Sequence, residues 1–120
     1  IYSIYLSFNK LTFLNKDIFI NTQKLNLLFL HNNEITSLEN DTFISLTYLE
    51  YLNLQENNLN KIHTNSFRGL ENLLELTFDK NQLSHSSIDI SFFYLIKLND
   101  LKINRNFFES IKNNLFIGLK

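Results

Sequence analysis

The sequence contains no cysteine, proline, methionine or tryptophan, and it has only two glycines among its 120 residues. Without cysteine the chain forms no disulfide and offers no thiolate to a metal ion. The two glycines, Gly69 and Gly118, stand alone, which excludes a glycine-rich loop for phosphate binding. This stretch also shows neither a run of 18 apolar residues nor a basic segment leading into a shorter apolar one, so it includes neither a membrane span nor a signal peptide.

An excess of charge of one sign is also lacking. Hydrophobic residues make up 44% of the chain, charged residues make up 19%, and the formal net charge is -1. This balance excludes a disordered polyelectrolyte and a surface that binds nucleic acid through general positive charge. Any recognition that depends on charge must therefore be local.

One spacing of apolar residues recurs along the whole chain. Its clearest copy is LEYLNLQENNLNKIHTNSFRGL, from Leu49 to Leu70, with the skeleton L..L.L..N.L..I....F..L. The first leucines alternate as one face of a short strand, an asparagine follows where the strand must end, and the later apolar residues bring the chain back. A unit this small cannot bury its apolar side chains alone. The sequence therefore predicts a solenoid, in which successive copies stack on one another.

Counting from Leu49 with a 24-residue period predicts five repeats with no linker between them. The fourth repeat is one residue longer than this period, because Phe92 arrives one place late. The extra residue predicts a local bulge on the convex or ascending side, with Ile88 in place of the missing apolar residue. Two interpretations of the bulge stay open, a neutral insertion or a contact loop that includes Ser86. The predicted repeats are 1–24, 25–48, 49–72, 73–97 and 98–120.

The pattern resembles that of leucine-rich-repeat proteins of the 24-residue typical class across essentially all 120 residues. The resemblance implies an α/β-type solenoid, a horseshoe with a parallel concave β-sheet and a mostly irregular or short helical convex side. It also implies a ladder of asparagines that satisfy backbone groups, and a spine of phenylalanines on the convex side. The asparagines are Asn9, Asn33, Asn57, Asn81 and Asn106, and the phenylalanines are Phe19, Phe43, Phe67, Phe92 and Phe116.

The chain departs from the family pattern in two respects. Members often carry proline after the second apolar pair, where this chain has Asn15, Glu39, His63 and Lys112, and this predicts a less rigid convex return. Members also usually close their cores with cysteine-containing caps, and none is visible here. We therefore expect an internal fragment with the caps absent, which on its own would be poorly soluble or self-associated.

Residues that point away from the core are the candidates for function. Strand geometry places the third, fifth, seventh and eighth positions of each repeat on the concave surface. Partner binding is predicted for thirteen of these residues: Tyr5, Phe8, Leu27, Phe29, His31, Tyr51, Asn53, Gln55, Glu56, Glu75, Asp79, Lys102 and Arg105.

These positions divide into an apolar half and a charged half. Tyr5, Phe8, Leu27, Phe29 and Tyr51 predict an exposed aromatic patch, which is where protein interfaces often keep their strongest anchors. The mixed charges beside it would set register and exclude wrong partners. The alternative is that the aromatic residues cover one another, or are covered by an adjacent repeat or a glycan.

The sequence predicts no catalytic constellation, no cofactor and no metal site. The three histidines occupy different repeat positions, so the repeat brings no two of them together, and we expect solvated surface histidines. The acidic residues of the charged half alternate with lysine and arginine, which favours a solvated charge network over a cation site. We therefore expect a protein that is not an enzyme.

Nucleic acid is not expected as a partner of this chain, because no stripe of lysine and arginine follows one repeat position. The tripeptide Asn40-Asp41-Thr42 is a sequon, which predicts a glycan at Asn40 if the protein is secreted. By family resemblance the 24-residue class is mostly extracellular, which favours an extracellular protein or the ectodomain of a membrane protein.

Two function classes remain open. The first is a protein-binding module of a receptor, or of a secreted or membrane-anchored protein similar to Toll-like and slit-like members. Such a module would bind a protein ligand on its concave face, without direct contact between this segment and a membrane. The second is a recognition scaffold of a larger enzyme, such as a kinase or cyclase. The oligomeric state stays open.

Overall fold

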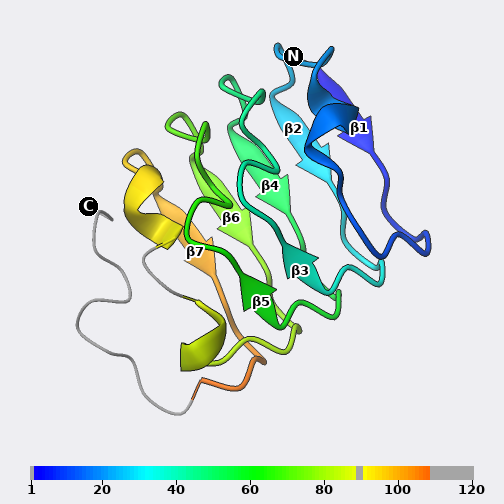
Figure 1. Cartoon of the computed structure of the whole chain (residues 1–120), viewed down its shortest axis with the longest axis vertical. Helices are drawn as coiled ribbons and strands as arrows, with labels where there is room; N and C mark the ends of the chain where they lie inside the picture. Colours follow the sequence, from blue (N-terminus) through cyan, green and yellow to red (C-terminus); the bar gives the residue numbers. More distant parts are fainter. Residues whose placement is uncertain (1, 89–90, 109–120) are drawn as a thin grey trace.

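The computed structural model describes residues 2–88 and 91–108. It is a stack of short turns, each of which begins with a three-residue strand (Figure 1). Five of these strands form one parallel sheet in the order β1-β2-β4-β6-β7. Their bounds are β1 Ser3–Tyr5, β2 Leu27–Phe29, β4 Tyr51–Asn53, β6 Glu75–Thr77 and β7 Asp100–Lys102.

The register of this sheet follows the repeat. Ser3 pairs with Leu27, its equivalent one repeat later, and the same shift joins β2 to β4 and β4 to β6. Between β6 and β7 the shift is one residue larger, because Glu75 pairs with Asp100 and not with Asn99. Residues at the same repeat position are therefore direct neighbours on adjacent strands, about 4.8 Å apart.

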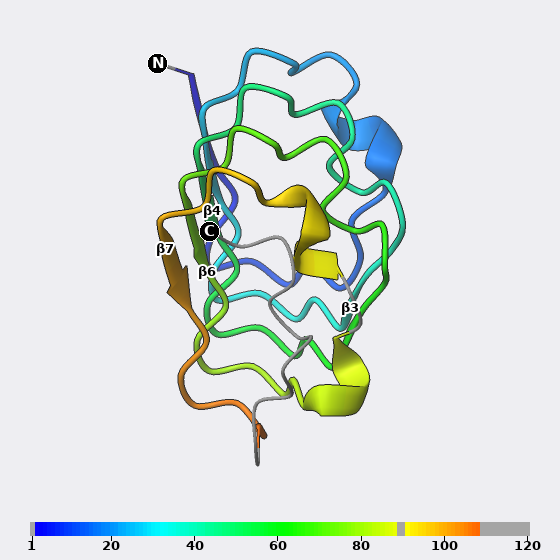
Figure 2. The same ribbon diagram turned by 90° about the vertical axis from the view of Figure 1, so that its left-hand side faces the viewer.

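The opposite side of the stack holds short strands and 3-10 helices (Figure 2). Two strands, β3 Ser37–Leu38 and β5 Lys61–Ile62, pair in parallel there. The helices are η1 Lys16–Phe19, η2 His85–Ser87 and η3 Ser91–Tyr94. The expected leucine-rich-repeat horseshoe is confirmed, with a finer detail: in the described residues the helices are all short 3-10 turns, and part of the convex side is a second small sheet.

One continuous core runs through the stack, between the large sheet and the convex side. The leucines of the skeleton are fully buried in the central repeats, as at Leu28, Leu52 and Leu76. In the first repeat, Leu6 and Leu11 are only partly buried against this core. The difference arises because a residue in a solenoid is covered by the turns on both sides of it.

The phenylalanine spine is present along the described part of the chain. Phe19, Phe43, Phe67 and Phe92 are all buried. The ring centroids of Phe19 and Phe43 lie 6.0 Å apart, and those of Phe67 and Phe92 lie 5.9 Å apart. These offset and tilted contacts are the preferred arrangements of aromatic pairs. Phe116 lies outside the described residues.

The asparagine ladder is also present, and its hydrogen bonds explain why asparagine recurs. The Asn57 side chain accepts a hydrogen bond from the Ile35 amide at 3.0 Å and donates to the carbonyl oxygens of Leu30 at 3.0 Å and Leu54 at 3.1 Å. Asn33, Asn81 and Asn106 make the corresponding bonds in their own repeats. An amide is suited to this task because it donates and accepts at once.

The longer fourth repeat is accommodated within its return segment. Ile88 is buried and forms a parallel bridge to Ile62, so it does occupy the place of the missing apolar residue. The chain uses five steps from Leu83 to Ile88, where the third repeat uses three from Leu59 to Ile62, and η2 lies in this longer segment. From Ile88 to Phe92 it uses four steps, where the third repeat uses five from Ile62 to Phe67, so the net excess is one residue. The insertion is thus accommodated locally, and the core residues beside it stay buried.

No helix in residues 2–88 or 91–108 is long and apolar enough to cross a membrane.

Candidate functional site

Aromatic side chains of β1, β2 and β4 form one connected cluster on the concave face. The rings of Tyr5 and Phe29 stack with centroids 4.5 Å apart and an interplanar angle of 4°. Phe29 also contacts Tyr51 at 5.1 Å. Because β1, β2 and β4 are neighbours in register, the rings stand side by side above the sheet. We call Tyr5, Phe8, Phe29, His31 and Tyr51 the aromatic stripe.

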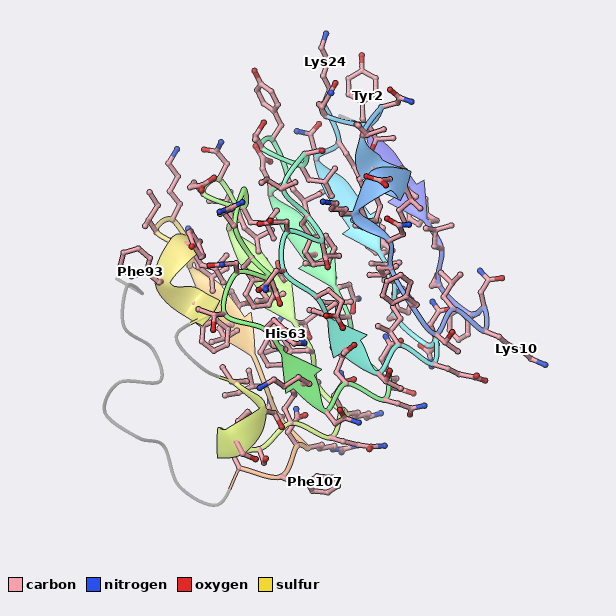
Figure 3. All side chains as sticks on the ribbon, viewed as in Figure 1. Tyr2, Lys10, Lys24, His63, Phe93 and Phe107 are labelled. Atoms are coloured by element: carbon pink, nitrogen blue, oxygen red, sulfur yellow. The ribbon has the colours of Figure 1, made fainter. Side chains whose placement is uncertain are left out.

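The stripe continues obliquely from the strands into the turn that follows them. His31 lies edge-on to Phe29 at 6.2 Å and to Phe8 at 5.5 Å. The expectation that all histidines are solvated is therefore wrong for His31, which is half-buried among rings, with its Nδ1 buried and without a hydrogen-bond partner in the described residues. His63 contacts Glu39 at 3.2 Å on the convex side (Figure 3).

The aromatic residues cover one another only in part. Tyr5 is 68% exposed and Phe8 is 74% exposed, whereas Phe29 and Tyr51 are half-buried. Leu27, beside Tyr51 in the register, is also half-buried. The stripe thus combines ring stacking with open apolar surface, which single scattered hydrophobic residues do not provide.

The eighth position of every repeat adopts an unexpected backbone conformation. Strands cover only the third to fifth positions, and the eighth lies in a turn with positive φ, 57° at Phe8 and 53° at Glu56. The same left-handed turn occurs at Asn32, Lys80 and Arg105. Four of these five residues are polar. Phe8 is the exception, and a bulky aromatic residue in this region is strained.

The charged half is tied together by bonds between neighbouring turns. The Lys80 ammonium lies 3.1 Å from the Glu56 carboxylate. Asn32 donates to the same carboxylate at 3.0 Å, and Gln55 donates at 3.3 Å. The hydrogen bond from Lys80, followed by those from Asn32 and Gln55, lowers the pKa of Glu56 below its usual value.

A second ionic group lies across the last two strands. The Lys102 ammonium is 2.9 Å from Glu75 and 3.4 Å from Asp100. Its hydrogen bond to Glu75, and then that to Asp100, raises the pKa of Lys102. Asp79 accepts a hydrogen bond from the Asn104 amide at 2.6 Å. Glu75 and Asp100 thus have an ion-pair partner and Asp79 has a hydrogen-bond donor, as expected for a mixed charge network.

The structure brings the predicted surface residues together on one face, in two groups. Tyr5, Phe8, Phe29, His31 and Tyr51 are joined by ring contacts. Asn53 connects the two groups, because it donates to the Tyr51 hydroxyl at 3.2 Å and accepts from the Gln55 amide at 3.0 Å. Arg105 lies in the left-handed turn of the last described repeat, with an exposed side chain.

Two residues that bond within the site occupy predicted concave positions but were not among the thirteen predicted to bind a partner. Lys80 and Asn32 both hold Glu56, and each lies one full repeat away from it in the sequence. A signal for both was present, since residues one repeat apart are strand neighbours. Thr77 was predicted to lie on the concave surface, as the fifth position of its repeat, and this is wrong: Thr77 is buried in the same row as Asn53, and its hydroxyl has no hydrogen-bond partner in the described residues.

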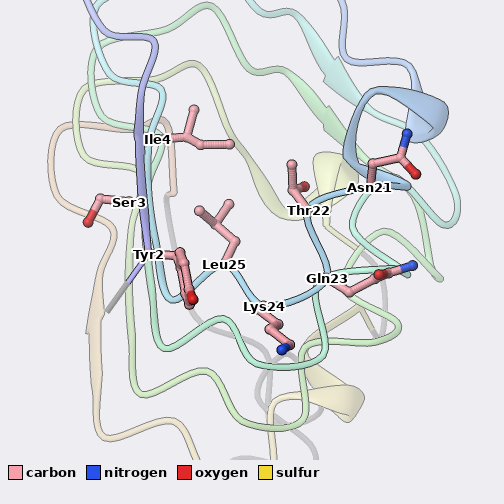
Figure 4. A pocket seen from close by; sticks show the side chains of 8 residues that line it. All are labelled: Tyr2, Ser3, Ile4, Asn21, Thr22, Gln23, Lys24 and Leu25. Atoms are coloured by element: carbon pink, nitrogen blue, oxygen red, sulfur yellow. The ribbon is translucent and has the colours of Figure 1, made fainter.

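A cavity of about 480 Å³ lies beside β1, away from the charged network. It is lined by residues 2–4 and 21–25 (Figure 4). Among the described residues of the lining, only Tyr2 and Lys24 have titratable side chains, and these two do not form a paired acid and base. Within the described part of the chain, no three His, Asp or Glu side chains gather as ligands for a metal ion.

Asn40 lies on the convex side with an exposed side chain. Its carbonyl Oδ1 accepts a hydrogen bond from the Asn65 amide at 3.0 Å. The Thr42 hydroxyl of the sequon is buried and donates to the Glu39 carbonyl oxygen at 2.8 Å. The side-chain nitrogen of Asn40, which is the atom that would carry a glycan, makes no hydrogen bond to the described residues.

Several solved structures share this fold. The leucine-rich repeat domain of APL1B is 19% identical, with a TM-score of 0.84, over 98% of this chain and 35% of that one. An internalin from Listeria monocytogenes is 23% identical, with a TM-score of 0.74, over 99% and 33%. A chain of the Drosophila Toll–Spatzle complex is 27% identical, with a TM-score of 0.86, over 98% and 18%.

The chain thus spans between about a fifth and about a third of the length of these structures. No curated protein sequence matches it. The profile of the family described as "Leucine rich repeat" matches residues 1–59 and 47–89, which together are more than half of the chain. Together with the repeat, the asparagine ladder and the parallel sheet, this match shows that the chain belongs to the leucine-rich repeat family.

Proposed function

We propose that this chain is a protein-binding module that recognises its partner through the concave face. The observation that supports this most directly is the aromatic stripe, in which five rings are in contact and two of them, Tyr5 and Phe8, are mostly exposed. Large aromatic side chains that are partly fixed by neighbours lose little conformational freedom on binding, which is why such residues are common anchors at interfaces.

The family and its structural relatives support the same proposal. Leucine-rich repeats form a protein-interaction scaffold, and a structurally similar chain has been solved in the Toll–Spatzle complex. We further propose an extracellular location, as part of a receptor or of a secreted or membrane-anchored protein. A glycan at Asn40 belongs to this proposal, since the glycosylated form of the Toll–Spatzle complex is among the similar structures.

The scaffold of a larger enzyme remains the second candidate. In that arrangement the concave face would select a substrate protein or a regulator for a kinase or cyclase domain elsewhere in the polypeptide. Both candidates use the same surface, so they share its test.

The test compares the protein with two serine variants that each remove one exposed or half-exposed aromatic ring. Phe29→Ser interrupts the stripe at its centre. Phe93→Ser is the matched control, because Phe93 is 55% exposed in η3 on the other side of the solenoid (Figure 3). Each immobilised variant is incubated with extract of the source organism, and the retained proteins are quantified by mass spectrometry.

We expect at least one protein to be retained by the unmodified chain and by Phe93→Ser, and to be lost from Phe29→Ser. Equal retention of every protein by all three would contradict binding through the concave face. Expression in a eukaryotic host tests the location separately: a mass shift that a glycosidase removes, and that Asn40→Gln abolishes, is expected for a secreted protein.

A further inference from the structure

Formal charge is distributed unevenly along the solenoid. Residues 25–72 carry six acidic side chains and only two basic ones, Lys61 and Arg68, which gives a formal charge of −4 (2 − 6). Residues 1–24 carry +2 (3 − 1), and residues 73–120 carry +1 (6 − 5). The acidic band therefore coincides with the second and third repeats, which supply Phe29, His31 and Tyr51 to the aromatic stripe.

The two basic residues of this band are directed elsewhere. Arg68 lies 2.8 Å from Asp41 on the convex side, and Lys61 belongs to the convex strand β5. The strands of the concave face and the turns that flank them, residues 26–34 and 50–58, contain no lysine or arginine. The charged side chains within residues 26–34 and 50–58 are therefore all acidic.

Three carboxylates belong to the strands and flanking turns of residues 26–34 and 50–58, and they are not equivalent. Glu56 is held by Lys80 from the next turn. Glu50 directly precedes Tyr51, and Glu34 follows His31 by three residues; both are exposed. Neither Glu34 nor Glu50 forms an ion pair with any lysine, arginine or histidine of the described residues, whereas Glu39, Asp41, Glu56, Glu75 and Asp100 all do.

The two exposed carboxylates lie at opposite ends of their strands. Glu50 is on the entry side of β4, and Glu34 is in the turn that leaves β2. The stripe runs obliquely between these two ends, from the turn at Phe8 to the start of β4 at Tyr51. A ligand that complements this arrangement has an apolar side chain in the middle and positive charge at both ends.

We infer that the stripe binds a protein segment in which an aromatic or aliphatic side chain is flanked on both sides by lysine or arginine, with Glu34 and Glu50 receiving the basic groups. The inference rests on the proposed function and specifies its partner. A segment of this kind also gains from the rings themselves, because a guanidinium or ammonium group is attracted to aromatic surface.

The test uses a library of random linear peptides of about twelve residues, displayed on phage and selected on the 120-residue chain at about 0.15 M ionic strength. Three strands span about 10 Å across the sheet, so an extended peptide of this length covers the stripe and leaves residues on both sides. The strongest binders are synthesised, and their dissociation constants are measured by fluorescence anisotropy.

Four variants are compared with the unmodified chain. Phe29→Ser reports on the stripe, and Glu34→Lys and Glu50→Lys report on the two carboxylates. Asp17→Lys is the control for charge, since it makes the same change of two charge units at an exposed residue of η1 on the convex side.

We expect the selected peptides to carry lysine or arginine on both sides of an apolar residue. Phe29→Ser should weaken their binding at least tenfold. Glu34→Lys and Glu50→Lys should each weaken it about threefold or more, and less so at about 1 M salt, where the Debye length is about 3 Å. Asp17→Lys should leave the dissociation constant within twofold.

Two kinds of failure are distinguishable. Peptides that depend on Phe29 but are neutral or acidic, or that respond to Asp17→Lys as strongly as to Glu34→Lys and Glu50→Lys, would overturn the inference and leave the proposed function standing. An absence of binders, or binders that do not depend on Phe29, would overturn both.

Discussion

The side-chain nitrogen Nδ2 of Asn57 donates a hydrogen bond to the carbonyl oxygen of Leu30, 3.0 Å away and 27 residues earlier in the chain. One side chain thereby joins two turns of the solenoid at the point where each leaves its strand. The same amide accepts from the Ile35 amide and donates to the Leu54 carbonyl oxygen. Each backbone N–H or C=O group left unpaired at this buried site would lower the free energy of unfolding.

Asn57→Ala is therefore expected to be strongly destabilising. It leaves several buried backbone groups without a partner, and each such group costs about 1–3 kcal/mol, so we expect the free energy of unfolding to fall by about 2–4 kcal/mol. Urea denaturation followed by circular dichroism measures the change. Asn58→Ala, at the exposed neighbouring asparagine, is the control and should change it by less than about 0.5 kcal/mol.

Gly69→Ala tests a close backbone approach between two repeats. Gly69 has a φ of 101°, and a Cβ there would lie 2.7 Å from the carbonyl oxygen and 2.8 Å from the Cα of Ile44. Both the strain and the overlap involve main chain, which cannot rotate away, so we expect a loss of at least about 2 kcal/mol in unfolding free energy. The measurement is thermal unfolding by calorimetry.

The corresponding residue of the preceding repeat, Ser45, provides the comparison for Gly69. It already carries a side chain at this repeat position and has no positive φ. Ser45→Ala should therefore shift the melting temperature little. Equal melting temperatures for Gly69→Ala and the unmodified chain would show that the two turns can separate at little cost.

Phe8→Asn separates the backbone strain of the left-handed turn from the stabilising ring contact of Phe8 with His31. Asparagine tolerates the left-handed conformation that costs other residues about 1–2 kcal/mol, while the lost ring contact with His31 is worth about 0.5–1.5 kcal/mol. The two effects nearly cancel, so we expect the unfolding free energy to stay unchanged or to rise by about 0.5 kcal/mol. Urea denaturation of this variant would contradict the account if it showed a loss above about 1 kcal/mol.

The reverse change one repeat later is the control for Phe8→Asn. Asn32→Phe places an aromatic residue in the same turn and also removes the hydrogen bond to Glu56. Both effects act in the same direction, and we expect a loss of about 1–2 kcal/mol.

The ion pair between Glu56 and Lys80 predicts a dependence on pH with a definite sign. The pKa of Glu56 in the folded chain lies below its ordinary value of 4.5, chiefly because Lys80 donates a hydrogen bond to the carboxylate. The ionised carboxylate therefore stabilises the folded state at neutral pH. This contribution is lost as the pH falls from about 4.5 through the lower pKa of the folded chain.

Titration of the Glu56 carboxyl carbon by NMR measures this shift directly. Lys80→Gln removes the principal cause, so the pKa should rise toward 4.5. Asn32 and Gln55 remain as donors and should keep part of the shift. A pKa of Glu56 that does not move in the Lys80→Gln variant would show that the ion pair is not formed in solution.

Much of the scaffold could be predicted because each skeleton position has one structural task. Leu52 and Phe67 are buried, Asn57 bonds to backbone, and Ile88 fills the apolar place in the longer repeat, all as their spacing indicates. The burial of an apolar set at a fixed period leaves few alternatives to stacking. Other concave positions also followed from the period, but Thr77, at the fifth position of its repeat, is buried.

The left-handed turns could not be predicted from residue type. Asparagine at position 32 is compatible with such a turn, but Phe8, Glu56, Lys80 and Arg105 are not residues that signal positive φ. The conformation is imposed by the path of the chain as it leaves each strand. The solvation of His31 was likewise misjudged, because its ring contacts Phe29 of its own repeat and also Phe8 of the preceding turn.

The sequence alone determined the repeat length, the core and the phenylalanine spine, since these follow from which apolar side chains are buried together. It also determined the asparagine ladder, since an amide at a fixed repeat position can satisfy buried backbone groups. Only the tertiary structure decided which exposed residues meet. The stacking of Tyr5 on Phe29, the pairing of Glu56 with Lys80 and the lack of an ion pair at Glu34 and Glu50 within the described chain depend on how each turn lies over the next. That alignment exists only once the turns are stacked, so the surface that a partner would meet is a property of the assembled solenoid.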